Sequence, residues 1–215
     1  MKQNKCSALI NGPIFKKSFL KGKYNGITEY LAKKTKSKGE VMLIYNSKLS
    51  VSPLTTHLPI NKVTQSIKKE KIIAKILKIN SFYENKLKFK PKIAITGLNP
   101  HCESFNNSSN KEKTEIIPAI RKLKKYKINI KGPMSADTIF LKSNLNKFDI
   151  IFGMYHDQVL GPMKTIFGFN AINITLGLPF IRITPDHGPN SEMFGMSRSN
   201  PNSFFEAVKF IKKHV

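Results

Sequence analysis

An α/β fold is predicted by this sequence, and three observations carry the prediction. Short apolar runs of strand length alternate with longer segments whose apolar residues recur at helical spacing. The longest apolar runs are far too short to span a bilayer, and a content of 40% hydrophobic and 23% charged residues is ordinary for a globular protein. At 215 residues the chain can bury a substantial core in one large or two small domains.

Seven short apolar runs are interpreted as strands, because they are bounded by polar or turn-forming residues. Residues 61–79 and 115–126 predict helices, since their apolar residues lie mostly three or four positions apart. Residues 81–87 and 106–110 are polar and are predicted to be loops. Strands that alternate with helices predict covered sheets. The strand-like runs are SALING near residue 7, VMLIYN near 41, LSVSPL near 49, KIAITGL near 92, DIIFGM near 149, AINIT near 171 and PFIRIT near 179.

The formal net charge of +24 raises the question of nucleic-acid binding, because lysines that neutralise phosphates give affinity without sequence preference. Only three of the 37 basic residues are arginine, the residue best suited to bidentate recognition of bases and phosphates. The lysine runs at 33–38 and 121–127 lack the repeated aromatic residues of a single-strand stacking platform. The charge is therefore interpreted as a solvated surface, and specific nucleic-acid binding is the weakest functional hypothesis.

Three of the five histidines follow strand-like runs, namely His57, His101 and His156. In open α/β sheets, ligands bind at the carboxyl ends of the strands. Three imidazoles that meet there would form a divalent metal site with positions left open for substrate. The spacings of 44 and 55 residues match no compact metal motif, so capping or core roles are an equal alternative on the residues alone.

The carboxyl-terminal half is rich in groups that suit an anionic, oxygen-rich substrate, among them Lys164, Asn173 and Arg182. Lys164 and Asn173 are equally compatible with a surface lysine and a turn residue. Arg182 follows an apolar strand in a chain with few arginines, which favours a paired or ligand-binding role. Cys6 and Cys102 are interpreted as reduced thiols without a catalytic role. The sequence contains no GxGxxG, P-loop or GxSxG motif.

Eight motifs occur in one order along the chain: NGP, GITE, TTHLP, GLNPH, GPMSADTIF, MYHDQ, GFNAINITLGLPFIR and PDHG. In these motifs the sequence resembles the 4-hydroxythreonine-4-phosphate dehydrogenase family of pyridoxal phosphate biosynthesis over essentially its whole length. The resemblance implies a two-domain α/β fold of the isocitrate/isopropylmalate dehydrogenase type, which binds NAD without GxGxxG. Residues 20–155 would form a metal-binding and dimerisation domain, and residues 1–19 with 156–215 the remaining part of the nucleotide-binding domain.

The same resemblance implies roles for individual residues. His57, His101 and His156 match the family's metal ligands, which are shared between the two subunits of a homodimer. Asp137 matches a recurrent position to which no role is assigned. The implied cofactors are NAD or NADP and one divalent metal per subunit, which would be zinc, magnesium or cobalt. The implied substrate-binding residues are Thr28, Lys164, Asn173 and Arg182, and the implied nucleotide-binding residues are Asp186, His187 and Gly188.

The implied reaction is oxidation of the secondary hydroxyl of 4-phosphooxy-L-threonine to a β-keto acid that loses carbon dioxide. NAD would take the hydride, and the metal would bind the hydroxyl and stabilise the developing alkoxide as a Lewis acid. Lys164 and Arg182 would hold the phosphate or the carboxylate, and Asn173 would help to fix the orientation. Metal-bound water and Lys164 are the two candidates for the general base.

Three departures from the family pattern bear on these expectations. The family has a substantial segment before the SALINGP strand, so the chain is expected to be an N-terminally incomplete member. Ile27 stands where the family has a substrate-binding histidine, and CESFNN replaces a glycine-rich stretch after His101. Two alternatives therefore stay open. One is a dehydrogenase of phosphothreonate or phosphoerythronate, and the other is a noncatalytic fragment that binds metal.

The expected location and partners follow from what the sequence contains. It shows no stretch typical of a signal peptide or a membrane span, and its two cysteines suit a reducing compartment. We therefore expect a cytoplasmic protein that acts on a small phosphorylated substrate as a homodimer. No specific nucleic-acid partner and no membrane partner are expected.

Overall fold

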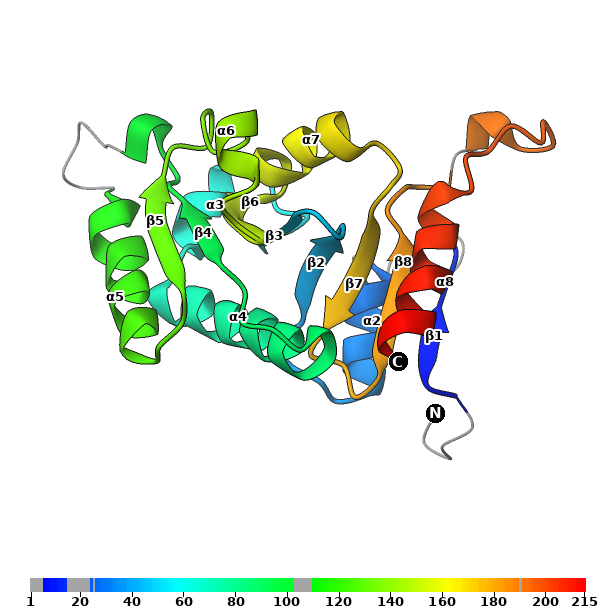
Figure 1. Ribbon diagram of the computed structural model, residues 1–215, viewed down its shortest axis with the longest axis horizontal. Helices are drawn as coiled ribbons and strands as arrows, with labels where there is room; N and C mark the ends of the chain where they lie inside the picture. The colour runs from blue at the N-terminus through cyan, green and yellow to red at the C-terminus, as the bar shows by residue number, and fades with distance from the viewer. Residues whose placement is uncertain (1–5, 15–23, 25, 103–109, 190) are drawn as a thin grey trace. The chain divides into compact units, whose positions relative to one another are not determined.

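The structure is a computed structural model, and its two compact units are described separately (Figure 1). The first unit is made of Met1–Asn46 with Phe167–Val215, and the second of Ser47–Ile166. In the described residues, each unit contains four strands with helices packed against them. The residues that the structure describes are 6–14, 24, 26–102, 110–189 and 191–215.

The first unit is built on a mixed sheet. Its strands are β1 (Ala8–Ile10), β2 (Val41–Tyr45), β7 (Ile172–Leu176) and β8 (Ile181–Pro185), and its helical segments are α2 (Ile27–Lys34), η5 (Ser191–Met193) and α8 (Asn202–His214). The strand order is β1-β8-β7-β2. β8 runs parallel to β1, whereas β7 is antiparallel to both of its neighbours.

The two faces of this sheet are covered by different helices, with α8 in front and α2 behind in Figure 1. On one face Tyr45 pairs with Ile172 in the ladder, and the ring of Phe210 on α8 packs against Tyr45 at 5.0 Å. Successive side chains of a strand point to opposite faces, so Asn173 and Thr175 face away from α8. The face that they share also carries Arg182, and it is the face that α2 approaches, because Thr28 of α2 bonds to Arg182.

The second unit contains a parallel sheet. Its strands are β3 (Ser50–Thr55), β4 (Ile93–Thr96), β5 (Ile130–Met134) and β6 (Ile150–Tyr155). Its α-helices are α3 (Ile60–Ser66), α4 (Lys69–Phe82), α5 (Ile117–Lys125), α6 (Lys142–Leu145) and α7 (His156–Phe167). Its short helical turns are η1 (Tyr83–Leu87), η2 (Pro100–Cys102) and η4 (Glu112–Ile116). The strand order is β3-β6-β4-β5, with every neighbouring pair parallel. The carboxyl ends of all four strands therefore lie at one edge of the sheet.

Helix α4 buries one apolar stripe, because Ile72, Ile76 and Ile79 recur at intervals of three and four residues. Ile120 and Leu123 of α5 are buried in the same pattern. Full burial of one such side chain contributes roughly 1.5–3 kcal/mol relative to exposure, so these stripes hold the helices on the sheet. The apolar residues whose spacing predicts these helices are thus the residues that are buried.

The structure confirms the seven predicted strands and both predicted helical segments, with three corrections. The segment 61–79 is two helices rather than one, because Ile67 adopts an extended backbone between α3 and α4. The loop predicted at residues 81–87 is wrong, since α4 continues into the π-helical turn η1. Strand β5, with Gly132 and Pro133 inside it, was not predicted. The loop predicted at 106–110 lies outside the described residues except for Asn110.

The borders of the compact units lie at residues 46/47 and 166/167. The functional division predicted from the family resemblance, residues 20–155 against 1–19 with 156–215, stays a prediction. No helix in the described part of the chain is both long enough and apolar enough to cross a membrane.

Candidate functional site

Arg182 lies on β8 in the first unit and is held by three side chains. Its Nε donates a hydrogen bond to Asn11 Oδ1 at 2.8 Å, while Nη1 donates to Thr28 Oγ1 at 3.0 Å and Thr175 Oγ1 at 2.8 Å. Thr175 is directly opposite Arg182 in the ladder between β7 and β8, and Thr28 lies in the first turn of α2. These bonds fix the plane of the guanidinium group without using Nη2.

The guanidinium group of Arg182 is a buried positive charge. The residue is 4% exposed, and burial lowers its pKa from the ordinary value of arginine to about 10, because removal from water disfavours the charged form. The negative charge of Glu29 acts in the opposite direction and raises the pKa of Arg182. A pKa of about 10 leaves the group protonated at neutral pH, so the first unit presents a permanent cation in a fixed orientation.

Asn173 Oδ1 and Glu29 Oε2, in the first unit, are buried oxygen atoms that have no hydrogen-bond partner among the residues that the structure describes. Asn173 shares its sheet face with Thr175, two residues along β7. Glu29 follows Thr28 on α2, and a Cβ at Gly26 would lie 2.7 Å from Glu29 Oε2, so the glycine leaves room for the carboxylate. A buried acceptor without a partner costs about 1–3 kcal/mol, which makes both atoms candidates for contact with a ligand.

All three predicted metal-binding histidines belong to the second unit and follow neighbouring parallel strands. His57 follows β3, His156 begins α7 directly after β6, and His101 lies in η2 after β4. Because the order is β3-β6-β4, the three residues lie at the same edge of the sheet, as the sequence analysis expects. The ring centres of His57 and His156 are 6.1 Å apart.

The structure brings together two of the three predicted ligands. Within the described residues, no group of three or more His, Cys, Asp or Glu side chains is placed to hold a metal ion. His101 is exposed on its loop, with φ 54° and ψ 15°. His57 also has a positive φ, of 47°. Non-glycine residues rarely adopt this left-handed backbone, and such residues cluster at functional sites.

The donor chemistry of the histidine pair fits a divalent ion. His156 Nδ1 lies 2.6 Å from Asp157 Oδ1, so the carboxylate assigns the proton to Nδ1 and leaves the Nε2 lone pair for a metal. Two imidazoles that bind one tetrahedral zinc ion through bonds of about 2.0–2.1 Å place their ring centres about 5 Å apart. The ring centres of His57 and His156, 6.1 Å apart, are about 1 Å farther apart than this, so the pair is close enough to serve one ion after a small movement of the side chains.

Lys164 lies on α7 in the second unit and is half-buried. The other predicted substrate-binding residues, Thr28, Asn173 and Arg182, belong to the first unit. Of these four residues, the structure joins Thr28 to Arg182 by a hydrogen bond and places Asn173 on the same sheet face as Arg182. Asp137, at the unassigned motif position, is exposed after β5.

The segment predicted to approach the nucleotide begins directly after β8. Asp186 is buried, and its backbone N donates to Ser203 Oγ on α8 at 2.8 Å. His187 Nδ1 lies 2.9 Å from the carbonyl oxygen of Gly188, and the His187 ring packs edge-on against Phe169. Asp186 is therefore buried beside α8, whereas His187 is half-buried and Gly188 is exposed.

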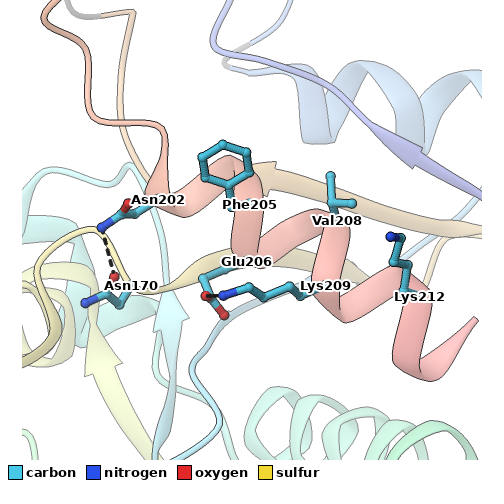
Figure 2. A pocket seen from close by; sticks show the side chains of 7 residues that line it. All are labelled: Asn170, Asn202, Phe205, Glu206, Val208, Lys209 and Lys212. Atoms are coloured by element: carbon cyan, nitrogen blue, oxygen red, sulfur yellow. Dashed lines mark hydrogen bonds and ion pairs between the residues drawn. The ribbon is translucent and has the colours of Figure 1, made fainter.

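A hollow of about 380 Å³ lies along α8 in the first unit (Figure 2). Asn202 Nδ2 donates to Asn170 Oδ1 at one end of it, and Lys209 pairs with Glu206 at 2.7 Å on the helix. Phe205 supplies an aromatic wall, as Figure 2 shows. No predicted site residue lines this hollow.

Three residues around Arg182 were missed in the sequence analysis. Thr175 lies two positions after Asn173, and the period of two along a strand would have placed it on the same face. Asn11 belongs to the NGP motif, which pointed to the family but not to a role for the residue. Glu29 belongs to the GITE motif in the same way.

Two residues of the second unit were missed as well. Gln158 lies two positions after His156 in MYHDQ, and its side chain bonds both to the end of β4 and to β6. Glu112 is 1% exposed and carries no local sequence signal, because its hydrogen bonds are made to a loop more than ten residues earlier in the chain.

A comparison with protein families matches residues 1–211 to the pyridoxal phosphate biosynthetic protein PdxA. The chain belongs to this family. It is 43% identical over 210 residues to the 4-hydroxythreonine-4-phosphate dehydrogenase of Sulfurihydrogenibium sp.. The matched region covers 96% of this chain and 65% of that protein. A relative from Oceanobacillus iheyensis is 36% identical over 211 residues, or 96% of this chain and 63% of that protein, and its name refers to a D-threonate 4-phosphate dehydrogenase.

Solved structures agree with this assignment. The 4-hydroxythreonine-4-phosphate dehydrogenase from Klebsiella pneumoniae has a TM-score of 0.83 at 28% identity, with 98% of this chain and 65% of that chain covered. An isocitrate dehydrogenase from Methylococcus capsulatus has a TM-score of 0.55 at 12% identity, with 96% of this chain and 67% of that chain covered, and this likeness shows the fold alone. The predicted isocitrate dehydrogenase type of fold is thus confirmed. The PdxA-family chain spans just under two thirds of the curated relatives that it matches.

Proposed function

We propose that this chain belongs to an NAD- and metal-dependent dehydrogenase of pyridoxal phosphate biosynthesis, which oxidises the secondary hydroxyl of 4-phosphooxy-L-threonine. The product is a β-keto acid that loses carbon dioxide. The observation that carries the proposal is the buried guanidinium group of Arg182, held in one orientation beside Thr28. Membership of the PdxA family and the name of the Sulfurihydrogenibium relative support the choice of reaction.

The residues around Arg182 suit an anionic, hydroxyl-bearing substrate. Nη2 carries two N–H groups that the bonds to Asn11, Thr28 and Thr175 do not use, and a phosphate or carboxylate oxygen is a strong acceptor for them. Thr28 Oγ1 accepts from Arg182, so its own hydroxyl proton is available to the same anion. Asn173 Oδ1 would accept a hydrogen bond from a substrate donor, which would remove the cost of its burial without a partner.

In the second unit His57 and His156 would hold the metal, and His101 would act as the third ligand. The family resemblance implies that such a site is shared across a homodimer, which is compatible with the absence of a three-ligand group among the described residues of one chain. When bound, NAD accepts the hydride and a divalent ion such as zinc, magnesium or cobalt supplies Lewis-acid stabilisation. Lys164 Nζ would hold a substrate oxygen or take the hydroxyl proton.

The remaining predicted features complete the proposal. His187 and Gly188 would face the nucleotide, with Asp186 holding their segment against α8. Cys6 and Cys102 are both free thiols, which supports a reducing compartment such as the cytoplasm. The substrate is small, and neither nucleic acid nor membrane takes part.

The test is NADH formation by the purified chain with 4-phosphooxy-L-threonine, with and without a divalent metal. Arg182→Lys keeps the charge but removes the planar fork, and loss of hydrogen bonds to a charged group costs about 1.5–3 kcal/mol. We expect kcat/KM to fall about tenfold to a hundredfold. Arg121→Lys, on the exposed face of α5, is the matched control and should leave activity unchanged. Equal activity in both variants contradicts the role given to Arg182.

D-threonate 4-phosphate is the second candidate substrate. It is favoured by Ile27, which replaces the family's histidine beside Thr28, and by the name of the Oceanobacillus relative. The two substrates are compared in the same NADH assay, and the larger kcat/KM decides between them. Oxidation of neither substrate by folded protein that binds metal would support the alternative of a noncatalytic fragment.

A further inference from the structure

Glu112 is a buried carboxylate to which the proposed function gives no role. It is 1% exposed and opens the π-helical turn η4. Its Oε1 accepts hydrogen bonds from the backbone N of Leu98 and of Asn99, both at 2.8 Å. Asn99 Nδ2 donates to Oε1 at 3.2 Å and to Oε2 at 3.0 Å. A buried charge is costly unless it is paired or hydrogen-bonded, and here the partners are three N–H groups of one short loop.

The loop that Glu112 holds is the one that carries His101. Its turn is closed by a hydrogen bond from the backbone N of Cys102 to the carbonyl oxygen of Asn99 at 3.1 Å, and this bond spans His101. His101 sits inside the turn with a left-handed backbone. The backbone of His101 is therefore anchored to Asn99.

A second contact fixes the start of the same loop. Gln158 Nε2 donates to the carbonyl oxygen of Gly97 at 2.8 Å, and its Oε1 accepts from Thr96 Oγ1 and from the backbone N of Met154. Gln158 lies in the first turn of α7, as does His156. The residues just before His101 are thus tied to the helix of His156 at Gly97 and to Glu112 at Leu98 and Asn99.

We propose that Glu112 is a positioning residue that fixes the His101 loop so that the His101 imidazole can ligate the metal. The inference rests on the metal site of the proposed function and adds to it the residue that sets the geometry of one ligand. An amide at this position would keep one acceptor oxygen for the backbone N–H groups of Leu98 and Asn99. Its NH2 group would face the NH2 group of Asn99, so only a carboxylate accepts from all three donors as they are placed. Partners that orient a metal ligand typically change metal affinity 10- to 100-fold when they are replaced.

The test is Co(II) binding by the purified chain, followed by calorimetry and by the visible absorption of the bound ion, which reports its ligands. Glu112→Gln is compared with Glu115→Gln. Glu115 belongs to the same turn, pairs with Lys68 and Lys111, and accepts from the backbone N of Lys69, so its replacement also removes hydrogen bonds but leaves the His101 loop untouched. His101→Ala supplies the spectrum of the ion without this ligand.

We expect Glu112→Gln to weaken Co(II) affinity at least tenfold and to shift the spectrum toward that of His101→Ala. The Co(II) affinity of Glu115→Gln should stay within twofold of that of the unchanged protein. Co(II) affinity and spectrum that are equal in both variants overturn the inference. Failure of the unchanged protein to bind Co(II) overturns the metal site and the role of Glu112 with it. If Glu112→Gln does not fold, Asn99→Ala removes one donor and keeps the carboxylate. A severalfold loss of affinity then supports the inference, and no loss overturns it.

Discussion

Replacement of Thr175 with valine removes one hydroxyl group and leaves the shape of the side chain almost unchanged. Thr175 is 3% exposed, and its Oγ1 accepts the hydrogen bond from Arg182 Nη1 at 2.8 Å. Hydrogen bonds to charged groups contribute about 1.5–3 kcal/mol to stability, and more is lost when a buried donor is left without a partner. Because Nη1 also donates to Thr28, the expected loss is at the lower end, about 1.5 kcal/mol in the free energy of unfolding.

The loss is measured by urea unfolding and by thermal unfolding of the purified chain. For a domain of this size each kcal/mol shifts Tm by about 2–4 °C, so Thr175→Val should lower Tm by about 3–6 °C. Thr184→Val is the control, since Thr184 lies on the same face two residues after Arg182, which does not bond to it. Equal losses in the two variants would refute the reasoning, because the cost would then belong to the strand and not to the bond with Arg182.

Three further outcomes are expected. Above pH 10, and up to the ordinary pKa of arginine, the unfolded chain binds more protons at Arg182 than the folded chain. The stability of the protein relative to Arg182→Gln should therefore rise with pH, by about 1 kcal/mol at pH 11 in parallel unfolding curves. A flat difference would contradict burial of the charge. Tyr83→Phe removes the 2.7 Å bond between Tyr83 Oη and Ser50 Oγ and should cost about 1 kcal/mol in the free energy of unfolding, whereas Phe82→Leu tests packing alone. Zinc should raise Tm, and His156→Ala should abolish the rise if His156 is a ligand.

The positions of the three histidines were predictable because they depend on a local pattern and one rule of geometry. Each follows an apolar run, and parallel strands place their carboxyl ends at one edge of a sheet. The strand order that makes β3, β6 and β4 neighbours is not visible in the sequence, although it is what puts His57 and His156 close to each other. The structure therefore shows that His57 and His156 are neighbours, which their spacing in the sequence does not determine.

The errors in the sequence analysis also have physical causes. The polar composition of residues 81–87 predicts a loop, but Tyr83 is buried and its hydroxyl bonds to Ser50, a contact that holds the segment in a helical turn. Strand β5 was missed because Gly132 and Pro133 lower its strand propensity. Its pairing with β4 overrides that local preference.

The sequence by itself determined the α/β class, most of the strands and helices, and the family, because each depends on residues close together in the chain or on motifs in a fixed order. Only the tertiary structure decided what surrounds the functional side chains. Arg182 bonds to residues 171 and 154 positions away, and Glu112 reaches back 13 positions to the backbone N of Asn99. Hydrogen bonds of this kind form when packing brings distant segments together, and no local periodicity records them.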